Sequence, residues 1–150
     1  MIIKPSAIGD VVHALPVLNL LRRRWPGAHV SWLVANSCAG LLEGHPQLDQ
    51  VIRFDRKRFG QSWKNPVAAL QMARLNQSLK QQKFDLVIDL QGLFRSGWMT
   101  WRTGAPIRVG STSAREFGGI FCTHLAPVDA EQQATERYLA VAEFLEAPRN

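Results

Sequence analysis

The chain has 150 residues, the usual size of one domain and enough to bury a core without disulfide bonds. Hydrophobic residues make up 46% and charged residues 20%, which excludes a globally disordered chain. No apolar run reaches the ~20 residues of a membrane span, and the first residues lack the apolar core of a signal peptide, so we expect a cytoplasmic protein. The formal charge of +6 favours anionic partners: nucleic acid, phosphorylated small molecules or a membrane surface.

Short apolar runs alternate with amphipathic stretches in the first half of the chain. Strands are expected at residues 2–3, 29–34 and 51–54. Apolar residues at three- and four-residue steps predict one helix from Asp10 to Arg24, which Pro26-Gly27 ends. A short helix is expected at 37–43, and a basic loop at 55–65.

The second half continues the same alternation. Helices are expected at 66–83, 93–101 and 130–147, and strands at 84–90 and 107–109. The continuous apolar run from Leu86 to Ile88 is typical of a central parallel strand that is buried on both faces. Residues 111–127 show no clear pattern.

This order of elements predicts one doubly wound, Rossmann-like α/β domain with a mostly parallel sheet. In such folds, ligands bind beyond the carboxyl ends of the strands. The polar clusters of the sequence lie at those ends, in residues 4–10, 53–64, 90–95 and 110–115. We therefore expect the functional site at this edge of the sheet, with Asp89 anchoring the end of its strand.

Four candidate site residues lie at or near the start of the first helix. Asp10 is either a helix cap or a carboxylate that takes a proton from a substrate hydroxyl. Ser6 and Gly9 belong to a loop whose N–H groups could bind an anion, or to an ordinary turn. His13 could bond Asp10 or a ligand, or simply be packed.

Further candidates follow later strands. Gln91 and Gly92 form the turn after the strand at 84–90, and Arg95 could clamp a carboxylate or phosphate, or be a solvated charge. A basic segment with interleaved Phe59 and Trp63 carries the cations Arg53, Arg56, Lys57, Arg58 and Lys64. It fits a solvated loop or a contact with anionic headgroups; nucleic acid is disfavoured because no RNA-binding motif accompanies it.

No metal or cofactor is expected from the sequence. Cys38 and Cys122 lie far apart and neither has a partner at metal-ligand spacing. The loop before Asp10 lacks the glycine pattern of a dinucleotide fingerprint.

Four motifs resemble glycosyltransferase family 9, the heptosyltransferases. The segment 4–16, KPSAIGDVVHALP, is similar to the family's opening of Lys, a Ser-containing loop and Gly-Asp-Val/Ile-hydrophobic-His-x-Leu-Pro. The segment 85–96, DLVIDLQGLFRS, resembles the family's strand–Asp–x–Gln–Gly–Leu–x–Lys/Arg–Ser turn. Ala114-Arg115-Glu116 and Glu136-Arg137-Tyr138 complete the set in matching order, with the greatest similarity to heptosyltransferase I-like members.

The resemblance implies a GT-B fold, in which an N-terminal domain holds the acceptor and a C-terminal domain holds the nucleotide sugar. Residues 1–150 would be the acceptor-binding domain, with the donor-binding domain absent from this chain and the chain alone inactive. The implied reaction is inverting transfer of a heptose from ADP-heptose to an inner-core acceptor of lipopolysaccharide, with Asp10 as general base. The acceptor-binding residues would be Ser6, Gly9, His13, Gln91, Gly92, Arg95 and Arg115.

The resemblance also gives the basic segment two roles. In the enzyme it would contact the phosphates of a lipid A-like acceptor, or anionic lipids, at the inner membrane. The alternative function is a non-catalytic module that binds an anionic glycolipid or a membrane.

Overall fold

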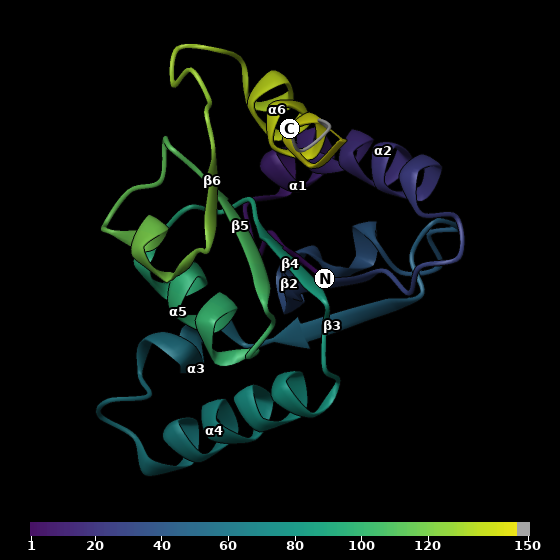
Figure 1. The fold of residues 1–150 in the computed structure, drawn as a ribbon. Helices are drawn as coiled ribbons and strands as arrows, with labels where there is room; N and C mark the ends of the chain where they lie inside the picture. Colours follow the sequence, from purple (N-terminus) through teal and green to yellow (C-terminus); the bar gives the residue numbers. More distant parts are fainter. Residues whose placement is uncertain (147–150) are drawn as a thin grey trace.

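The structure, a computed structural model, describes residues 1–146. Its centre is a six-stranded parallel sheet in the order β3-β2-β1-β4-β5-β6 (Figure 1). The strands are β1 (Ile2–Ile3), β2 (Ser31–Ala35), β3 (Gln50–Phe54), β4 (Leu86–Asp89), β5 (Ile107–Ser111) and β6 (His124–Ala126). Every pair of neighbouring strands is parallel, so the prediction of a doubly wound, Rossmann-like domain is confirmed.

Helices cover both faces of the sheet (Figure 1). One face carries α1 (Ile8–Ala14), α2 (Pro16–Arg24) and α6 (Ala134–Glu146). The other carries α3 (Arg56–Gly60), α4 (Pro66–Gln81) and α5 (Phe94–Arg102). Because successive strand residues point to opposite faces, Trp32 and Val34 pack in the first core, while Leu33 packs in the second.

The short strand β1 lies in the middle of the sheet, between β2 and β4. Its two residues are fully buried, and the amide of Leu90 donates to the carbonyl of Ile3 at 3.0 Å. From β1 the strand order runs outward to β3 on one side and to β6 on the other. The carboxyl ends of β1 and β4 therefore form the switch point where doubly wound folds bind their ligands.

The predicted helix 10–24 is two helices, and the sequence interpretation was wrong on this point. α1 ends at Ala14 and α2 begins at Pro16, because a proline has no N–H to continue the first helix but is well accepted in a first turn. α1 also begins at Ile8 with Ala7 as its cap. Asp10 therefore lies in the first turn and is not the helix cap.

Several short elements also differ from the prediction. The supposed loop 55–65 contains α3, whose cap Asp55 accepts hydrogen bonds from the amides of Lys57 and Arg58 at 3.0 and 3.2 Å. The helix expected at 37–43 is a 3₁₀-helix, η1 (Asn36–Leu41). The featureless stretch 111–127 holds β6 and a second 3₁₀-helix, η2 (Gly118–Phe121). The closing helix begins at Ala134, and its predicted last residue, 147, lies outside the described residues.

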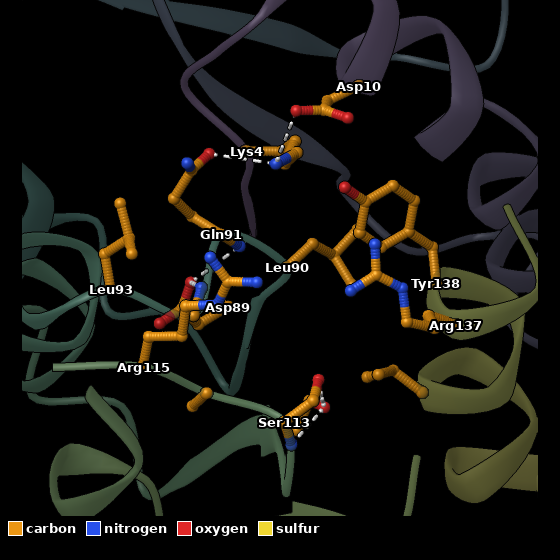
Figure 2. A pocket seen from close by; sticks show the side chains of 14 residues that line it. Lys4, Asp10, Asp89, Leu90, Gln91, Leu93, Ser113, Arg115, Arg137 and Tyr138 are labelled. Atoms are coloured by element: carbon orange, nitrogen blue, oxygen red, sulfur yellow. Dashed lines mark hydrogen bonds and ion pairs between the residues drawn. The ribbon is translucent and has the colours of Figure 1, made fainter. Parts of the chain in front are cut away.

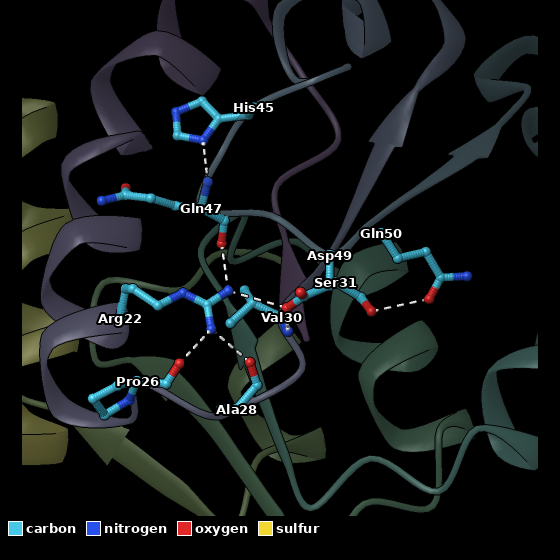
Figure 3. A network of polar contacts seen from close by, with 9 residues as sticks. All are labelled: Arg22, Pro26, Ala28, Val30, Ser31, His45, Gln47, Asp49 and Gln50. Atoms are coloured by element: carbon cyan, nitrogen blue, oxygen red, sulfur yellow. Dashed lines mark hydrogen bonds and ion pairs between the residues drawn. The ribbon is translucent and has the colours of Figure 1, made fainter.

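A polar network fixes the amino edge of the sheet, at the start of β2 and β3 (Figure 3). The Arg22 guanidinium donates to the carbonyls of Pro26, Ala28 and Gln47 and to the Asp49 carboxylate at 3.0 Å. Asp49 also accepts from the amide of Val30 at 2.7 Å, and these contacts lower the pKa of its carboxyl.

Across residues 1–146, no helix has the length and apolar character that crossing a membrane would need.

Candidate functional site

A cavity of about 350 Å³ opens at the switch point, beyond the carboxyl ends of β1 and β4 (Figure 2). Its volume is at the lower end of the range typical of small-ligand sites. The polar residues that line it are Lys4, Asp10, Asp89, Gln91, Ser111, Ser113, Arg115, Arg137 and Tyr138. They come from the segment after β1, from α1 and α6, and from the carboxyl ends of β4 and β5 with the loops that follow them. The fold therefore brings segments from near both ends of the chain to one place.

Lys4 lines this cavity and contacts several of its other polar residues. Its side chain is only 3% exposed, and its Nζ donates to Gln91 Oε1 at 3.0 Å and lies 3.9 Å from Asp10 Oδ2. The ring of Tyr138 lies 5.3 Å from the same nitrogen. Burial lowers the pKa of Lys4, whereas the carboxylates of Asp10 and Asp89 act in the opposite direction. The lysine thus links the candidate base to the turn after β4.

Asp10 combines an ion pair with access to solvent. Its side chain remains 47% exposed, although Lys4 beside it is buried. The first turn of α1 places the carboxylate at the rim of the cavity, where a bound hydroxyl could reach it. This arrangement is what a general base needs: an oxygen that is held in place but not covered.

Asp89 shapes the turn that presents Gln91. Its buried carboxylate accepts from the amides of Gln91 and Gly92 at 3.0 and 3.1 Å and from Ser96 Oγ at 3.0 Å. Burial raises the pKa of Asp89 to about 6, although these hydrogen bonds and Lys4 lower it. Gly92 has a positive φ of 69°, and a Cβ there would lie 3.3 Å from the Cα of Ala114. The expected anchoring role of Asp89 is confirmed.

The other predicted residues divide between two neighbouring cavities. Gln91, Gly92 and Arg115 line the main cavity together with Asp10. Ser6 and Arg95 instead line a smaller space of about 70 Å³, which also touches Gln91. Arg95 stacks over the ring of Phe59 at 5.5 Å.

Gly9 and His13 lie outside both cavities. Gly9 is exposed in α1, and a Cβ there would meet nothing within 4 Å, so no close approach requires a glycine. His13 Nδ1 lies 2.9 Å from Thr135 Oγ1 of α6, which makes Thr135 its described partner in place of Asp10.

The basic segment is exposed, but part of its charge is internally paired. Arg53 forms an ion pair with Glu43, and Arg58 Nε lies 3.5 Å from Asp55 Oδ2. The remaining cations are Arg56, Lys57 and Lys64, the last lying 4.4 Å from the ring of Trp63. Trp63 itself is 77% exposed. Arg56 also lines the smaller cavity, so the segment adjoins the site.

Sequence reasoning missed part of the main cavity. Lys4, Arg137 and Tyr138 belong to the motifs, but the sequence predicted no role for them in the site. The helical spacing of α6 does not indicate that this helix reaches the switch point. Burial raises the pKa of Tyr138 to about 12, so its phenol is protonated at neutral pH.

A parallel sheet with a polar cavity at its switch point defines a Rossmann-like ligand-binding domain. Residues 72–148 match the model of glycosyltransferase family 9 (heptosyltransferase). The lipopolysaccharide heptosyltransferase 1 of Pseudomonas aeruginosa is 34% identical over 91% of this chain, and that of Salmonella typhimurium is 28% identical over the same share. The chain belongs to glycosyltransferase family 9.

The fold of a solved family member is also similar. The structure of the Escherichia coli heptosyltransferase WaaC with ADP-2-deoxy-2-fluoro heptose superposes with a TM-score of 0.86 at 27% identity, covering 99% of this chain and 49% of that one. The chain spans 39% of the Pseudomonas relative and 44% of the Salmonella relative. It thus corresponds to less than half of the curated relatives that it matches.

Proposed function

We infer that this chain is the acceptor-binding half of an inverting heptosyltransferase. In this proposal a heptose passes from ADP-heptose to a sugar of the lipopolysaccharide inner core, and Asp10 is the general base. The observation that carries the proposal is the Asp10 carboxylate, held by Lys4 yet half exposed, at the rim of the switch-point cavity. The family membership and the names of the relatives support the sugar and the acceptor.

The chemical step needs one base. An acceptor hydroxyl attacks the anomeric carbon of the heptose from the face opposite to ADP, so a new C–O bond forms while the bond to the ADP phosphate breaks. The hydroxyl proton passes to Asp10, and ADP leaves with the bonding electrons. A sugar hydroxyl is a weak nucleophile, and a positioned base typically accelerates such a step by about 10²–10⁴-fold.

The acceptor occupies the main cavity in this proposal. Gln91, the Gly92 turn and Arg115 hold it there, while Ser6 and Arg95 contact a further part of it in the adjoining smaller cavity. Gly9 and His13 have weaker support, because neither lines a cavity. His13 acts through its contact with Thr135, which joins α1 to α6.

The exposed basic segment extends the acceptor site outward. Arg56, Lys57 and Lys64, with Arg53 and Arg58 beside them, contact the phosphates of a lipid A-like acceptor or anionic headgroups at the cytoplasmic face of the inner membrane. This contact is made by exposed charged side chains and buries no apolar core in the membrane. It is therefore peripheral and sensitive to salt.

A separate domain holds the donor in this proposal. The relatives are more than twice as long as the segment matched here, which supports a donor-binding part beyond the matched region. The 150-residue chain then catalyses no transfer by itself.

The test is a chimera that joins residues 1–150 to the remaining part of the Pseudomonas aeruginosa lipopolysaccharide heptosyltransferase 1. Transfer is followed as ADP release with a deacylated core fragment as acceptor. Asp10→Asn should lower kcat by about 10²–10⁴-fold. The matched control is Asp85→Asn, because Asp85 is exposed at the opposite end of β4. Full activity of the Asp10→Asn chimera would remove the role of the base.

A further inference from the structure

The outward side of α5 has an unusual composition for a surface helix. Every residue of α5 that is not buried is an aromatic residue or an arginine: Phe94, Arg95, Trp98, Trp101 and Arg102. A surface helix normally exposes a mixture of charged and polar residues on the side that faces water. α5 departs from this pattern, because its outward side offers aromatic rings and guanidinium groups and no other side chain.

Phe121 of η2 extends this outward side of α5. Its ring centre lies 5.2 Å from that of Phe94 and 6.3 Å from that of Trp101. The two elements are in direct contact, since a Cβ on Gly97 would clash with the carbonyl oxygen of Gly118. The three rings therefore form one continuous apolar surface across α5 and η2.

Two more apolar side chains project into solvent beside these rings. Phe117 is 81% exposed and Ile120 is 70% exposed. Phe117 also has a positive φ of 61°, which is uncommon for a bulky residue and costs conformational free energy. The amide of Gly118 donates to the carbonyl of Arg115 at 2.9 Å, and this turn holds the backbone that presents the phenyl ring. We call the following five residues the aromatic face: Phe94, Trp101, Phe117, Ile120 and Phe121.

The charges on the aromatic face are positive. Residues 94–102 and 117–121 contain two arginines and no acidic residue, although Glu116 directly precedes the second segment. The Arg102 guanidinium lies 5.9 Å from the centre of the Trp101 ring. An exposed apolar patch with a charged rim marks a binding surface for a protein or a membrane. Aromatic rings interspersed with cations are typical of side chains at the boundary between the headgroups and the acyl chains of an anionic bilayer.

The aromatic face adjoins the basic segment. Arg95 of α5 stacks over the ring of Phe59 of α3 at 5.5 Å, and the ring centres of Phe59 and Trp98 lie 6.3 Å apart. Figure 1 shows α3 and α5 next to each other on the same side of the sheet. The cations of the basic segment and the aromatic face thus belong to neighbouring elements. This arrangement favours a membrane over a protein partner, because a bilayer offers anionic headgroups and acyl chains over a wide surface.

We propose that the aromatic face inserts into the headgroup region of a bilayer that contains anionic phospholipid. Phe117 and Ile120, the most exposed members, reach the boundary of the acyl chains, and Arg102 lies at the level of the phosphates. The basic segment supplies the charged part of the contact, and the aromatic face supplies the apolar part. The orientation rests on the membrane contact of the proposed function, whereas no step of the transfer reaction is needed.

The experiment is fluorine NMR of the 150-residue chain labelled with fluorotryptophan. The probes are nanodiscs of equal parts phosphatidylglycerol and phosphatidylcholine, with or without a nitroxide near the start of an acyl chain. The nitroxide should strongly broaden the signal of Trp101. Trp25, half-buried at the end of α2 on the other side of the sheet, is the internal control and should keep its line width. Equal broadening of both signals, or none at Trp101, would overturn the proposal.

A paired substitution measures the apolar contribution. Phe117→Ser/Ile120→Ser changes two exposed residues, so the chain should fold as the parent does. Its affinity for vesicles of the same lipids, measured by sedimentation, should fall by at least about tenfold, because two apolar side chains no longer leave water. The matched control is Val12→Ser/Leu41→Ser, which removes two exposed apolar side chains of α1 and η1 and should leave the affinity unchanged. The same affinity in the parent and in Phe117→Ser/Ile120→Ser would contradict the insertion.

Salt distinguishes the aromatic face from the basic segment. Added salt screens charges, so the effect of Arg56→Gln/Lys57→Gln on affinity should shrink, whereas the ratio between the parent and Phe117→Ser/Ile120→Ser should persist. If the chain sediments with anionic vesicles while Trp101 keeps its line width, the basic segment binds alone and the insertion is refuted. If Phe117→Ser/Ile120→Ser instead separates a dimer in analytical ultracentrifugation without changing vesicle affinity, the aromatic face joins two copies of the chain and the proposal fails.

Discussion

Lys4 is the residue on which the geometry of the site depends. Its buried Nζ joins Gln91 Oε1 at 3.0 Å to Asp10 Oδ2 at 3.9 Å, and its aliphatic stem is covered by the fold. Removing the charge while keeping the length of the side chain would release both partners. The candidate base and the acceptor-binding amide would then no longer share one anchor.

We predict that Lys4→Met weakens binding of a deacylated lipopolysaccharide core fragment at least tenfold, equivalent to about 1.4 kcal/mol. The methionine can occupy the buried stem, so thermal unfolding should show a folded chain. Calorimetric titration measures the affinity. Lys80→Met, at an exposed position of α4, is the control. An unchanged affinity in Lys4→Met would show that Lys4 does not organise the site.

Asp89 makes stability depend on pH. Its pKa is raised from 3.8 to about 6 by burial, so the folded state binds a proton more tightly than the unfolded state. The stability that this proton supplies is fully present below about pH 4 and is lost as pH rises through 6. The loss amounts to at most about 3 kcal/mol.

Asp89→Asn should remove this contribution. The free energy of unfolding in urea, measured from pH 4 to pH 7, should fall more steeply with pH in the parent chain than in Asp89→Asn. Other titrating groups cancel when the two curves are subtracted. A difference between parent and variant that stays constant over this range would be inconsistent with a raised pKa.

At the scale of elements, the long and strongly patterned segments were predictable. The apolar run of β4 and the helix opened by Pro66 are found where the sequence places them. The break at Pro16 was missed because apolar spacing continues across Leu15 from one helix into the next. α3 has only five residues and no buried one, so periodicity could not indicate it, although Asp55 was a visible cap.

The contact between α5 and η2 is close enough to require a glycine. A Cβ on Gly97 would lie 2.5 Å from the carbonyl oxygen of Gly118 and 2.8 Å from Cδ2 of Phe121. We predict that Gly97→Ala destabilises the chain by about 1–3 kcal/mol, because the two elements must move apart. Gly40→Ala in η1 is the control, since a Cβ there meets nothing within 4 Å. Equal urea midpoints for the two variants would contradict this packing.

At the scale of the whole molecule, the location of the site was predictable but its full membership was not. The rule that ligands bind at the carboxyl ends of parallel strands correctly brought Asp10, Gln91 and Arg115 together. It could not add Arg137, because α6 is not a strand end and reaches the cavity only by packing over α1 and α2. Tertiary packing of distant segments leaves no local pattern in the sequence.

The basic segment predicts a measurable affinity for anionic surfaces. At low salt the chain should sediment with vesicles that contain anionic lipid and not with neutral ones. The double variant Arg56→Gln/Lys57→Gln should lose about 2 kcal/mol of binding, at about 1 kcal/mol for each basic residue near the surface. The control Arg23→Gln/Lys80→Gln changes two exposed cations elsewhere. Equal binding to neutral and anionic vesicles would count against both the membrane contact and the alternative function as a membrane-binding module.

The central claim is that this chain binds the acceptor and not the donor. Calorimetric titration of residues 1–150 with a deacylated lipopolysaccharide core fragment, and in parallel with ADP-heptose, tests it most directly. We predict saturable binding of the core fragment, lost in Arg115→Gln, and no binding of ADP-heptose. Binding of ADP-heptose without binding of the core fragment would contradict the account, because the cavity beside Asp10 would then belong to the donor.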